Sequence, residues 1–372
     1  MVASVVVVNH NYGRFLRTAI DSALAQTYLD TEVVVVDDGS RDDSRSIIGS
    51  YGDEVVAVLQ QNGGQAAAWN SGLKMATGEA ICFLDADDQL AATAIQRSLP
   101  LLAQPGVVKV HWPLCEVDGE GRTSGLLAPR ERLPRGYLKA TVVSEGPHSY
   151  PTPAASGKLW SREFLERVMP LPPAARRAHG ADVYVSTVAP LYGAIERVDE
   201  PMGYYRLHGS NNWASMSFDE QAQFDLAAYR LHCEALARHC AALGIPADPE
   251  RWKRNSWLHR RVEAAAEIAA RVPAGDSFVL IDRNEWGMDE TAGRRAIPFL
   301  ERGGRYWGLP QDDAEAVEEL ERRRRAGTRF VAVGWPAFWS LEHYGRMRGY
   351  LYESSHEVAQ GEHVIVFALS PQ

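Results

Sequence analysis

The chain has 372 residues, of which 45% are hydrophobic and 23% are charged, and its formal net charge at pH 7 is −9. This composition is typical of a globular protein, and a chain of this length usually forms more than one domain. The acidic balance argues against nucleic acid as a partner and against attraction to anionic membranes. The four cysteines show neither metal-ligand spacing nor a disulfide framework, so we expect a reduced, cytoplasmic protein.

No membrane-spanning segment is predicted. The apolar run at residues 2–8 lacks the basic start of a signal sequence, and polar residues follow it instead of a small-residue cleavage site. Elsewhere no apolar stretch approaches the roughly 18 residues that a membrane-spanning helix needs. Any contact with a membrane is therefore expected to be peripheral, at its inner face.

The first half of the chain alternates between short strands and amphipathic helices. The strands are nearly continuous β-branched runs, as in parallel sheets that are covered on both faces. Residues 122–158 are rich in Pro, Gly and Arg, and we interpret them as an ordered excursion or a mobile loop. The βαβ alternation predicts an α/β fold with a mostly parallel sheet. Strands are predicted at residues 4–8, 32–36, 55–60, 80–84, 107–117 and 195–198, and helices at 14–26, 65–75, 164–169 and 181–192.

The composition changes near residue 217. Ser217 and Glu220 form a capping box for a helix that should end at Gly244. Apolar residues in this helix have the spacing of a heptad seam. We favour packing of the seam against a second helix at residues 249–272, which makes a helical hairpin; the alternative is a homodimer. The seam residues are Leu226, Tyr229, Cys233, Leu236, Cys240 and Leu243.

An α/β pattern resumes after residue 274. The four arginines at 322–325 end a helix that begins with glutamates, an order that the helix dipole favours, so we interpret them as structural. The tryptophans of this segment are expected in a core or an interface, with stacking on a glycan as the alternative. We divide the chain into a first domain at 1–216, a hairpin at 217–273 and a C-terminal α/β domain of unknown role at 274–372. In the last domain, strands are predicted at 277–281, 329–333 and 363–369, and helices at 312–325 and 338–351.

The most informative motif is the acidic end of the strand at residues 80–84. Asp85, Asp87 and Asp88 follow it, at the carboxyl edge of the sheet where open α/β folds bind their ligands. Carboxylates crowded together repel one another unless a cation lies among them, and hard oxygen ligands suit Mg²⁺ or Mn²⁺ that also contacts substrate phosphates. The alternative is a solvated acidic turn or a helix cap.

Three further motifs accompany the carboxylates. Asp38 ends the second strand and is expected at the same edge of the sheet. Gly63 and Gly64 form a turn before a helix N-terminus, a place suited to anions. A Tyr-Arg-Leu-His element ends at His208.

In these motifs the sequence resembles the family 2 glycosyltransferases, which have the GT-A fold. The resemblance covers roughly residues 1–215. It implies an inverting transfer of a sugar from a nucleotide-diphosphate donor, with a UDP-sugar favoured, to an acceptor hydroxyl, assisted by Mg²⁺ or Mn²⁺. The acceptor would be a glycan, a lipid-linked molecule or a small molecule. The matching segments are residues 5–12, 19–27, 33–40, 63–72, 83–88, 180–182 and 204–211.

The resemblance also implies roles for individual residues. Asp87 would ligate the metal, and His208 would supply another ligand or contact the diphosphate. Asp182 would be the general base, which removes the proton of the acceptor hydroxyl as it attacks; the alternative for Asp182 is a helix cap. Asp38 would accept a hydrogen bond from the nucleobase, and Asp85 would face the ribose or the metal's waters. The nucleotide-sugar site as a whole would comprise Val8, His10, Asp38, Gln65, Asn70, Asp85 and Arg206.

Two positions depart from the family's pattern. Trp69 stands where many members carry a basic residue, so a diphosphate contact is missing or replaced, and Ala181 stands where members often have Glu before the base. The main alternative function is a non-catalytic sugar-nucleotide or glycan-binding module. A nucleotidyltransferase is disfavoured, because the first strand lacks the glycine-rich, basic loop that such enzymes carry.

Overall fold

The computed structural model describes residues 1–172, 180–208, 218–287 and 290–370. The chain divides into two units, the first formed by residues 1–214 and 227–253 and the second by residues 215–226 and 254–372. The segment that we expected to form a separate hairpin at 217–273 is thus shared between the two units. None of the helices in the described ranges is long and apolar enough to cross a bilayer.

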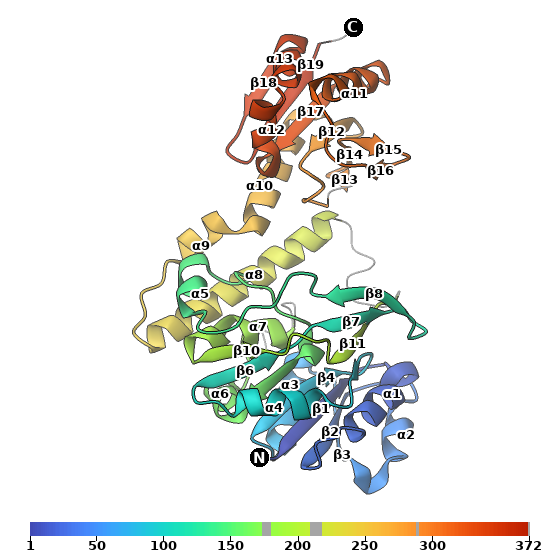
Figure 1. Cartoon of the computed structure of the whole chain (residues 1–372), viewed down its shortest axis with the longest axis vertical. Coiled ribbons are helices and arrows are strands. Elements are labelled where there is room, and N and C mark those ends of the chain that lie inside the picture. The colour runs from blue at the N-terminus through green and yellow to red at the C-terminus, as the bar shows by residue number, and fades with distance from the viewer. Residues whose placement is uncertain (173–179, 209–217, 288–289, 371–372) are drawn as a thin grey trace. The chain divides into compact units, whose positions relative to one another are not determined.

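The first unit is built on a seven-stranded sheet with the strand order β10-β6-β9-β4-β1-β2-β3 (Figure 1). All neighbouring strands are parallel except at β9, which runs antiparallel to both β4 and β6. The four strands predicted before residue 85 and the strand at 195–198 are confirmed. The strands are β1 (Ala3–Asn9), β2 (Thr31–Asp38), β3 (Val56–Gln60), β4 (Ala80–Asp85), β6 (Val107–His111), β9 (Lys158–Ser161) and β10 (Ala194–Arg197).

Helices cover both faces of this sheet, as the continuous apolar strands require. On one face α1 (Gly13–Leu24), α2 (Ser44–Gly49) and α4 (Ala94–Leu102) pack on Val5, Val7 and their neighbours. On the other face α3 (Gln65–Met75), α6 (Arg162–Val168) and α7 (Ala181–Val188) pack on Val6, Phe83 and Trp160. The helix predicted at 181–192 ends earlier, because Pro190 lies in a 3₁₀ turn at Ala189–Leu191.

A smaller sheet with the order β5-β11-β7-β8 lies beside the end of β4. The strand that we predicted at residues 107–117 is in fact two strands, because Trp112 and Pro113 interrupt it and proline cannot donate to a strand ladder. The segment at 122–158 contains a strand and the helix α5 (Lys139–Glu145), so it is an ordered excursion. The strands of the small sheet are β5 (Gln89–Leu90), β7 (Leu114–Val117), β8 (Thr123–Ala128) and β11 (Gly203–Arg206).

The helix that carries the heptad seam is α8 (Phe218–Ala242), and the capping residue Ser217 lies outside the described residues. Within the first unit, the Tyr229 hydroxyl donates to the carbonyl oxygen of Trp252 at 3.0 Å, and Cys233, Leu236 and Cys240 are buried. Because these side chains are already buried within the chain, the seam gives no support to a homodimer, which stays a prediction. The second expected helix is two helices, α9 (Pro249–Asn255) and α10 (Trp257–Arg271), divided at Ser256, whose side chain accepts a hydrogen bond from the backbone N–H of His259.

The second unit contains a six-stranded sheet with the order β13-β14-β12-β17-β19-β18. The three predicted strands are confirmed, whereas β13, β14 and β18 were not predicted, and the helix expected at 338–351 is two helices. The strands β15 (Glu301–Arg302) and β16 (Arg305–Tyr306) form a separate two-stranded sheet. The remaining elements are β12 (Ser277–Ile281), β13 (Glu290–Thr291), β14 (Arg294–Pro298), β17 (Phe330–Gly334), β18 (Ser355–Gln360), β19 (Val364–Leu369), α11 (Asp313–Arg325), α12 (Phe338–His343) and α13 (Gly345–Ser354).

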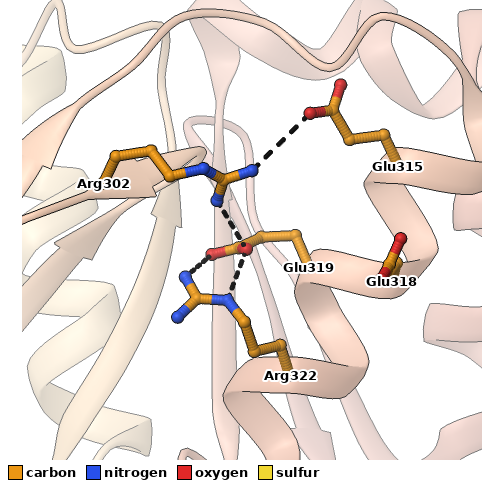
Figure 2. Close-up of a pocket in the computed structure, with 5 residues that line it drawn as sticks. All are labelled: Arg302, Glu315, Glu318, Glu319 and Arg322. Atoms are coloured by element: carbon orange, nitrogen blue, oxygen red, sulfur yellow. Dashed lines mark hydrogen bonds and ion pairs between the residues drawn. The ribbon is translucent and has the colours of Figure 1, made fainter.

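The arginine run at the end of α11 is structural, as expected. Glu319, almost fully buried, accepts hydrogen bonds from Arg322, Arg323 and Arg302. Figure 2 shows Arg302 and Arg322 turned toward Glu319, where they line a cavity of about 350 Å³. The charges of this cavity are therefore compensated within the unit. Trp286 is likewise in the core: it is buried, and its ring lies 4.9 Å from that of Trp335.

Candidate active site

The acidic end of β4 meets the end of β11. Oδ2 of Asp87 lies 3.0 Å from Nε2 of His208, and the two side chains are only 13% and 7% exposed. The rings of Tyr12 and Phe15 flank the imidazole, with ring centroids 5.4 and 5.0 Å away. The two residues predicted to hold the metal are thus brought together, with little access to bulk water.

Asp88 holds this arrangement in place. Its Oδ1 accepts a hydrogen bond from the backbone N–H of Arg206 at 3.0 Å, and its Oδ2 accepts one from the Ser156 hydroxyl at 2.7 Å. Burial raises the pKa of Asp88 well above its usual range, and the negative charges of Asp87 and Asp85 add to the rise. Asp88 is therefore neither a solvated turn residue nor a helix cap; it joins β11 to the loop after β4.

Arg206 has a comparable holding role. Its guanidinium donates to the carbonyl oxygens of Asp87 at 2.9 Å and Asp118 at 3.1 Å, and it lies over the ring of Phe15. We expected Arg206 in the nucleotide-sugar site. The structure places its guanidinium against the backbone of the acidic loop, so it orders the loop that carries Asp87.

Gln65 connects the acidic loop to α7. Its Nε2 donates to Oδ1 of Asp85 at 3.3 Å, and its Oε1 accepts a hydrogen bond from the backbone N–H of Ala181 at 2.8 Å. The preceding residue, Gly180, has φ = +90°, and a Cβ added there would lie 2.2 Å from Oε1 of Gln65. Only glycine leaves room for this connection. Burial, then the charges of Asp87 and Asp182, raise the pKa of Asp85 to about 7.

Asp182 lies in the first turn of α7, on the same face of the main sheet as Gln65. The Nζ of Lys158, a fully buried side chain on β9, lies 2.8 Å from its Oδ2. A helix N-terminus and a buried ammonium thus both bring positive charge next to this carboxyl group. Lys158 was not predicted, because a single lysine in a Pro- and Gly-rich segment carries no sequence signal.

The predicted base pocket is organised by the glycine turn. Oδ1 and Oδ2 of Asp38 accept hydrogen bonds from the backbone N–H groups of Gly63 at 2.8 Å and Gly64 at 2.7 Å. Nδ1 of His10 lies 2.7 Å from the carbonyl oxygen of Asp38, and the carbonyl oxygen of Val8 accepts from the N–H of Ala86 at 3.1 Å. Asp38 thus fixes the turn before α3; contact with a nucleobase stays a prediction.

Asn70 and Trp69 lie elsewhere. The side-chain amide of Asn70 binds both backbone groups of Leu171, at 2.8 and 3.1 Å, and lines a cavity of about 580 Å³ between α3 and α6. Its contacts are therefore with the chain and not with the acidic cluster. Trp69 is fully buried and stacks on Phe83 with ring centroids 3.7 Å apart, so the family's basic position is here a core position.

The carboxylate and imidazole donors of this site suit a divalent cation. Within the described ranges, no three His, Cys, Asp or Glu side chains are grouped closely enough to hold a metal by themselves. Asp87 and His208 would therefore supply two ligands, and substrate oxygens and water the others. Such sharing is typical of Mg²⁺ sites that bind phosphates.

Comparisons with known proteins show to which family the chain belongs. The model of the family "Glycosyl transferase family 2" matches residues 4–167. An uncharacterized glycosyltransferase of Nostoc sp. is 37% identical over 221 residues, which is 58% of this chain and 67% of that protein. One of Rickettsia prowazekii is 38% identical over 101 residues, or 27% of this chain and 32% of that protein.

Solved structures were compared as well. TarS of S. aureus, in complex with UDP, has a TM-score of 0.44 and 14% identity, over 100% of this chain and 97% of that one. Together with the mixed seven-stranded sheet covered by helices, the match to the family bears out the expected α/β GT-A fold. The chain is a glycosyltransferase and belongs to glycosyltransferase family 2.

Proposed function

We propose that the chain is an inverting glycosyltransferase, which moves a sugar from a nucleotide-diphosphate donor to an acceptor hydroxyl. The observation that carries this proposal is the meeting of three features at one edge of the sheet: the Asp87–His208 pair, Asp85, and Asp182 at the start of α7. Gln65 joins the last two through hydrogen bonds to Asp85 and to the backbone of Ala181. The site thus has a pair of side chains that can hold a cation and, in a fixed relation to it, a carboxylate that can act as a base.

In this proposal Asp182 removes the proton of the acceptor hydroxyl as its oxygen attacks the anomeric carbon. A general base in hydrogen-bond reach of the attacking group contributes typically 10²–10⁴-fold to the rate. Lys158 holds only one oxygen of this carboxylate, Oδ2, so the other oxygen can take up the proton. Attack from the side opposite the leaving group inverts the anomeric centre.

Asp87 and His208 would hold the divalent cation, for which Mg²⁺ and Mn²⁺ are the candidates. When bound, such a cation neutralises charge that develops on the leaving diphosphate. Tyr12 and Phe15 limit access of water to these two side chains, and burial, then the charges of Asp87 and Asp85, raise the pKa of Tyr12 to about 12, so its hydroxyl stays protonated. The protein itself thus contributes an aspartate–histidine pair that is already in position and has little access to water.

A UDP-sugar is the favoured donor, with Val8, His10 and Asp38 around the base. TarS and a mannosyltransferase of Pyrobaculum calidifontis have been solved with UDP-GlcNAc and with GDP-Man and Mn²⁺, respectively. The acceptor is a glycan, a lipid-linked molecule or a small molecule, and the protein acts in the cytoplasm or at the inner face of the membrane. The net charge of −9 gives no reason to expect nucleic acid as a partner.

Thermal-shift screening of UDP-, GDP- and dTDP-sugars, with and without Mn²⁺, tests the donor site. A ligand at about 100 times its dissociation constant stabilises the folded state by about 2.7 kcal/mol, so the preferred nucleotide should stand out, and more so with Mn²⁺. The proposal is wrong if no nucleotide raises the melting temperature. A non-catalytic binding module, the alternative function, would show the shift without hydrolysing the donor.

A further inference from the structure

We propose that Lys158 is a positioning residue for Asp182. Its buried ammonium holds Oδ2 of the carboxylate and turns Oδ1 toward the acceptor. The proposal deepens the function proposed above and rests on it, since it concerns the group that takes the acceptor's proton.

The sheet register places Lys158 under α7. Lys158 is the first residue of β9, where it is opposite His111 of β6, and Trp160 is opposite Lys109. Residues opposite one another, and residues two apart on one strand, lie on the same face of a sheet. Trp160 packs with Ala181 of α7, so that face is the one that α7 covers. The ammonium of Lys158 therefore extends from this face of the sheet to the first turn of α7.

Among the described residues, Lys158 is the cation that pairs with Asp182. The other titratable groups nearby lie on β6, at the end of β4 and before β9. Burial, followed by the charge of Lys158, lowers the pKa of Lys109 well below its usual value, and burial likewise lowers the pKa of His111. Burial thus disfavours the charged form of both side chains. The remaining groups are Asp85 at the end of β4, which is acidic, and Tyr150 before β9, a phenol whose pKa burial raises.

A buried carboxyl group needs a polar partner, and Lys158 supplies it for Asp182. The contact also fixes the side chain: the Nζ–Oδ2 distance is 2.8 Å. Within the described part of the chain, no hydrogen bond reaches Oδ1, which remains for the substrate. During transfer the O–H bond of the acceptor breaks and its proton moves to Oδ1. The acceptor oxygen bonds the anomeric carbon, and the electrons of the broken bond to phosphate leave with the nucleoside diphosphate.

The test compares Lys158→Met, Lys158→Gln and Lys158→Arg. Lys109→Met is the matched control, because Lys109 is an equally buried lysine on the same face of the sheet. Release of UDP from UDP-glucose, measured over a range of donor concentrations, gives kcat and KM for each variant. Each substitution is also combined with Asp182→Asn, so that its effect is compared with and without the carboxylate.

We expect Lys158→Arg and Lys109→Met to keep kcat within a few-fold of wild type. In Lys158→Met and Lys158→Gln, which leave the carboxylate without its partner, kcat should fall by about 10-fold or more while KM for UDP-glucose changes little. In the Asp182→Asn background the same substitutions should change kcat by less than about two-fold, because the two residues act as a unit. A purely structural lysine would lower kcat equally in both backgrounds.

Equal losses of kcat in both backgrounds, or an unchanged kcat in Lys158→Met and Lys158→Gln, would overturn the proposal. Full turnover by Asp182→Asn would instead overturn the base role. If neither neutral variant folds, as judged by circular dichroism, Lys158→Arg must restore both the fold and kcat. Failure of Lys158→Arg to do so also counts against the proposal.

Discussion

Nε2 of His208 lies 3.0 Å from Oδ2 of Asp87, although 121 residues separate the two in sequence. The contact depends on β11, which pairs antiparallel with β5 directly after the acidic motif and parallel with β7. Asp88 reinforces this pairing by accepting the backbone N–H of Arg206. Two distant motifs of the sequence thus form one site because a strand of four residues carries the second motif to the first.

Replacing either member of this pair should abolish metal-dependent donor cleavage. Asp87→Asn and His208→Gln each remove a ligand for the cation, so we expect a loss of about 100-fold or more in Mn²⁺-dependent hydrolysis of UDP-glucose. Release of UDP measures this, and Asp53→Asn and His356→Gln are surface controls. Activity within a factor of two of wild type in both site variants would exclude the pair as a metal site.

Asp182→Asn should separate binding from chemistry. The amide is nearly isosteric with the carboxylate but cannot take up a proton, so turnover should fall by about 10²–10⁴-fold. Binding of UDP by calorimetry should stay within a few-fold of wild type, because Asp182 contacts Lys158 and not the glycine turn. Normal turnover in Asp182→Asn would rule out its role as general base.

Asp88→Ala should destabilise the first unit without acting on chemistry directly. It leaves the backbone N–H of Arg206 unsatisfied in a buried place, which costs about 1–3 kcal/mol. Asp88→Asn keeps an acceptor for this group and should cost less. Urea unfolding measures both, with exposed Asp53→Ala as the control. Equal stability of Asp88→Ala and wild type would mean that this bond does not hold β11.

Lys109 should make stability depend on pH. Burial lowers its pKa in the folded state well below the value of about 10.4 in an unfolded chain. Between the two values the unfolded state binds one proton more, so stability rises with pH by about 1.4 kcal/mol per unit. The faces of Tyr150 and Trp160 attract a cation, but desolvation outweighs them because the side chain is fully buried.

Lys109→Met removes this proton and should flatten the dependence below about pH 10. Urea unfolding at several pH values checks it. Lys74→Met is the control, since Lys74 is a lysine on the surface. A slope in Lys109→Met equal to that of wild type would show that Lys109 is charged in the folded protein.

Local sequence patterns predict the main sheet well, because each strand is buried on both faces and therefore consists almost entirely of apolar residues. Asp38 and Asp85 lie at one edge of the sheet, as expected for the carboxyl ends of two strands that both run parallel to β1. Gln65 begins α3 where predicted, since the glycine turn before it sets the helix start.

The small sheet could not be predicted, because β5 has two residues and β8 is largely exposed, so neither has an apolar pattern. The roles of Asp88 and Arg206 follow from this sheet and were missed for the same reason. Lys158 was missed because burial of a lysine depends on the partner that tertiary structure supplies, here Asp182 on a later helix.

The account stands or falls on metal-dependent cleavage of a nucleotide sugar that requires both halves of the site. The measurement is release of nucleoside diphosphate from a panel of UDP-, GDP- and dTDP-sugars by wild type, Asp87→Asn and Asp182→Asn, with Mn²⁺ and with chelator. We predict that wild type cleaves at least one donor with Mn²⁺ and that chelator and each substitution abolish the cleavage. Cleavage that persists in chelator and in Asp182→Asn, or no cleavage of any donor by wild type, would contradict the account.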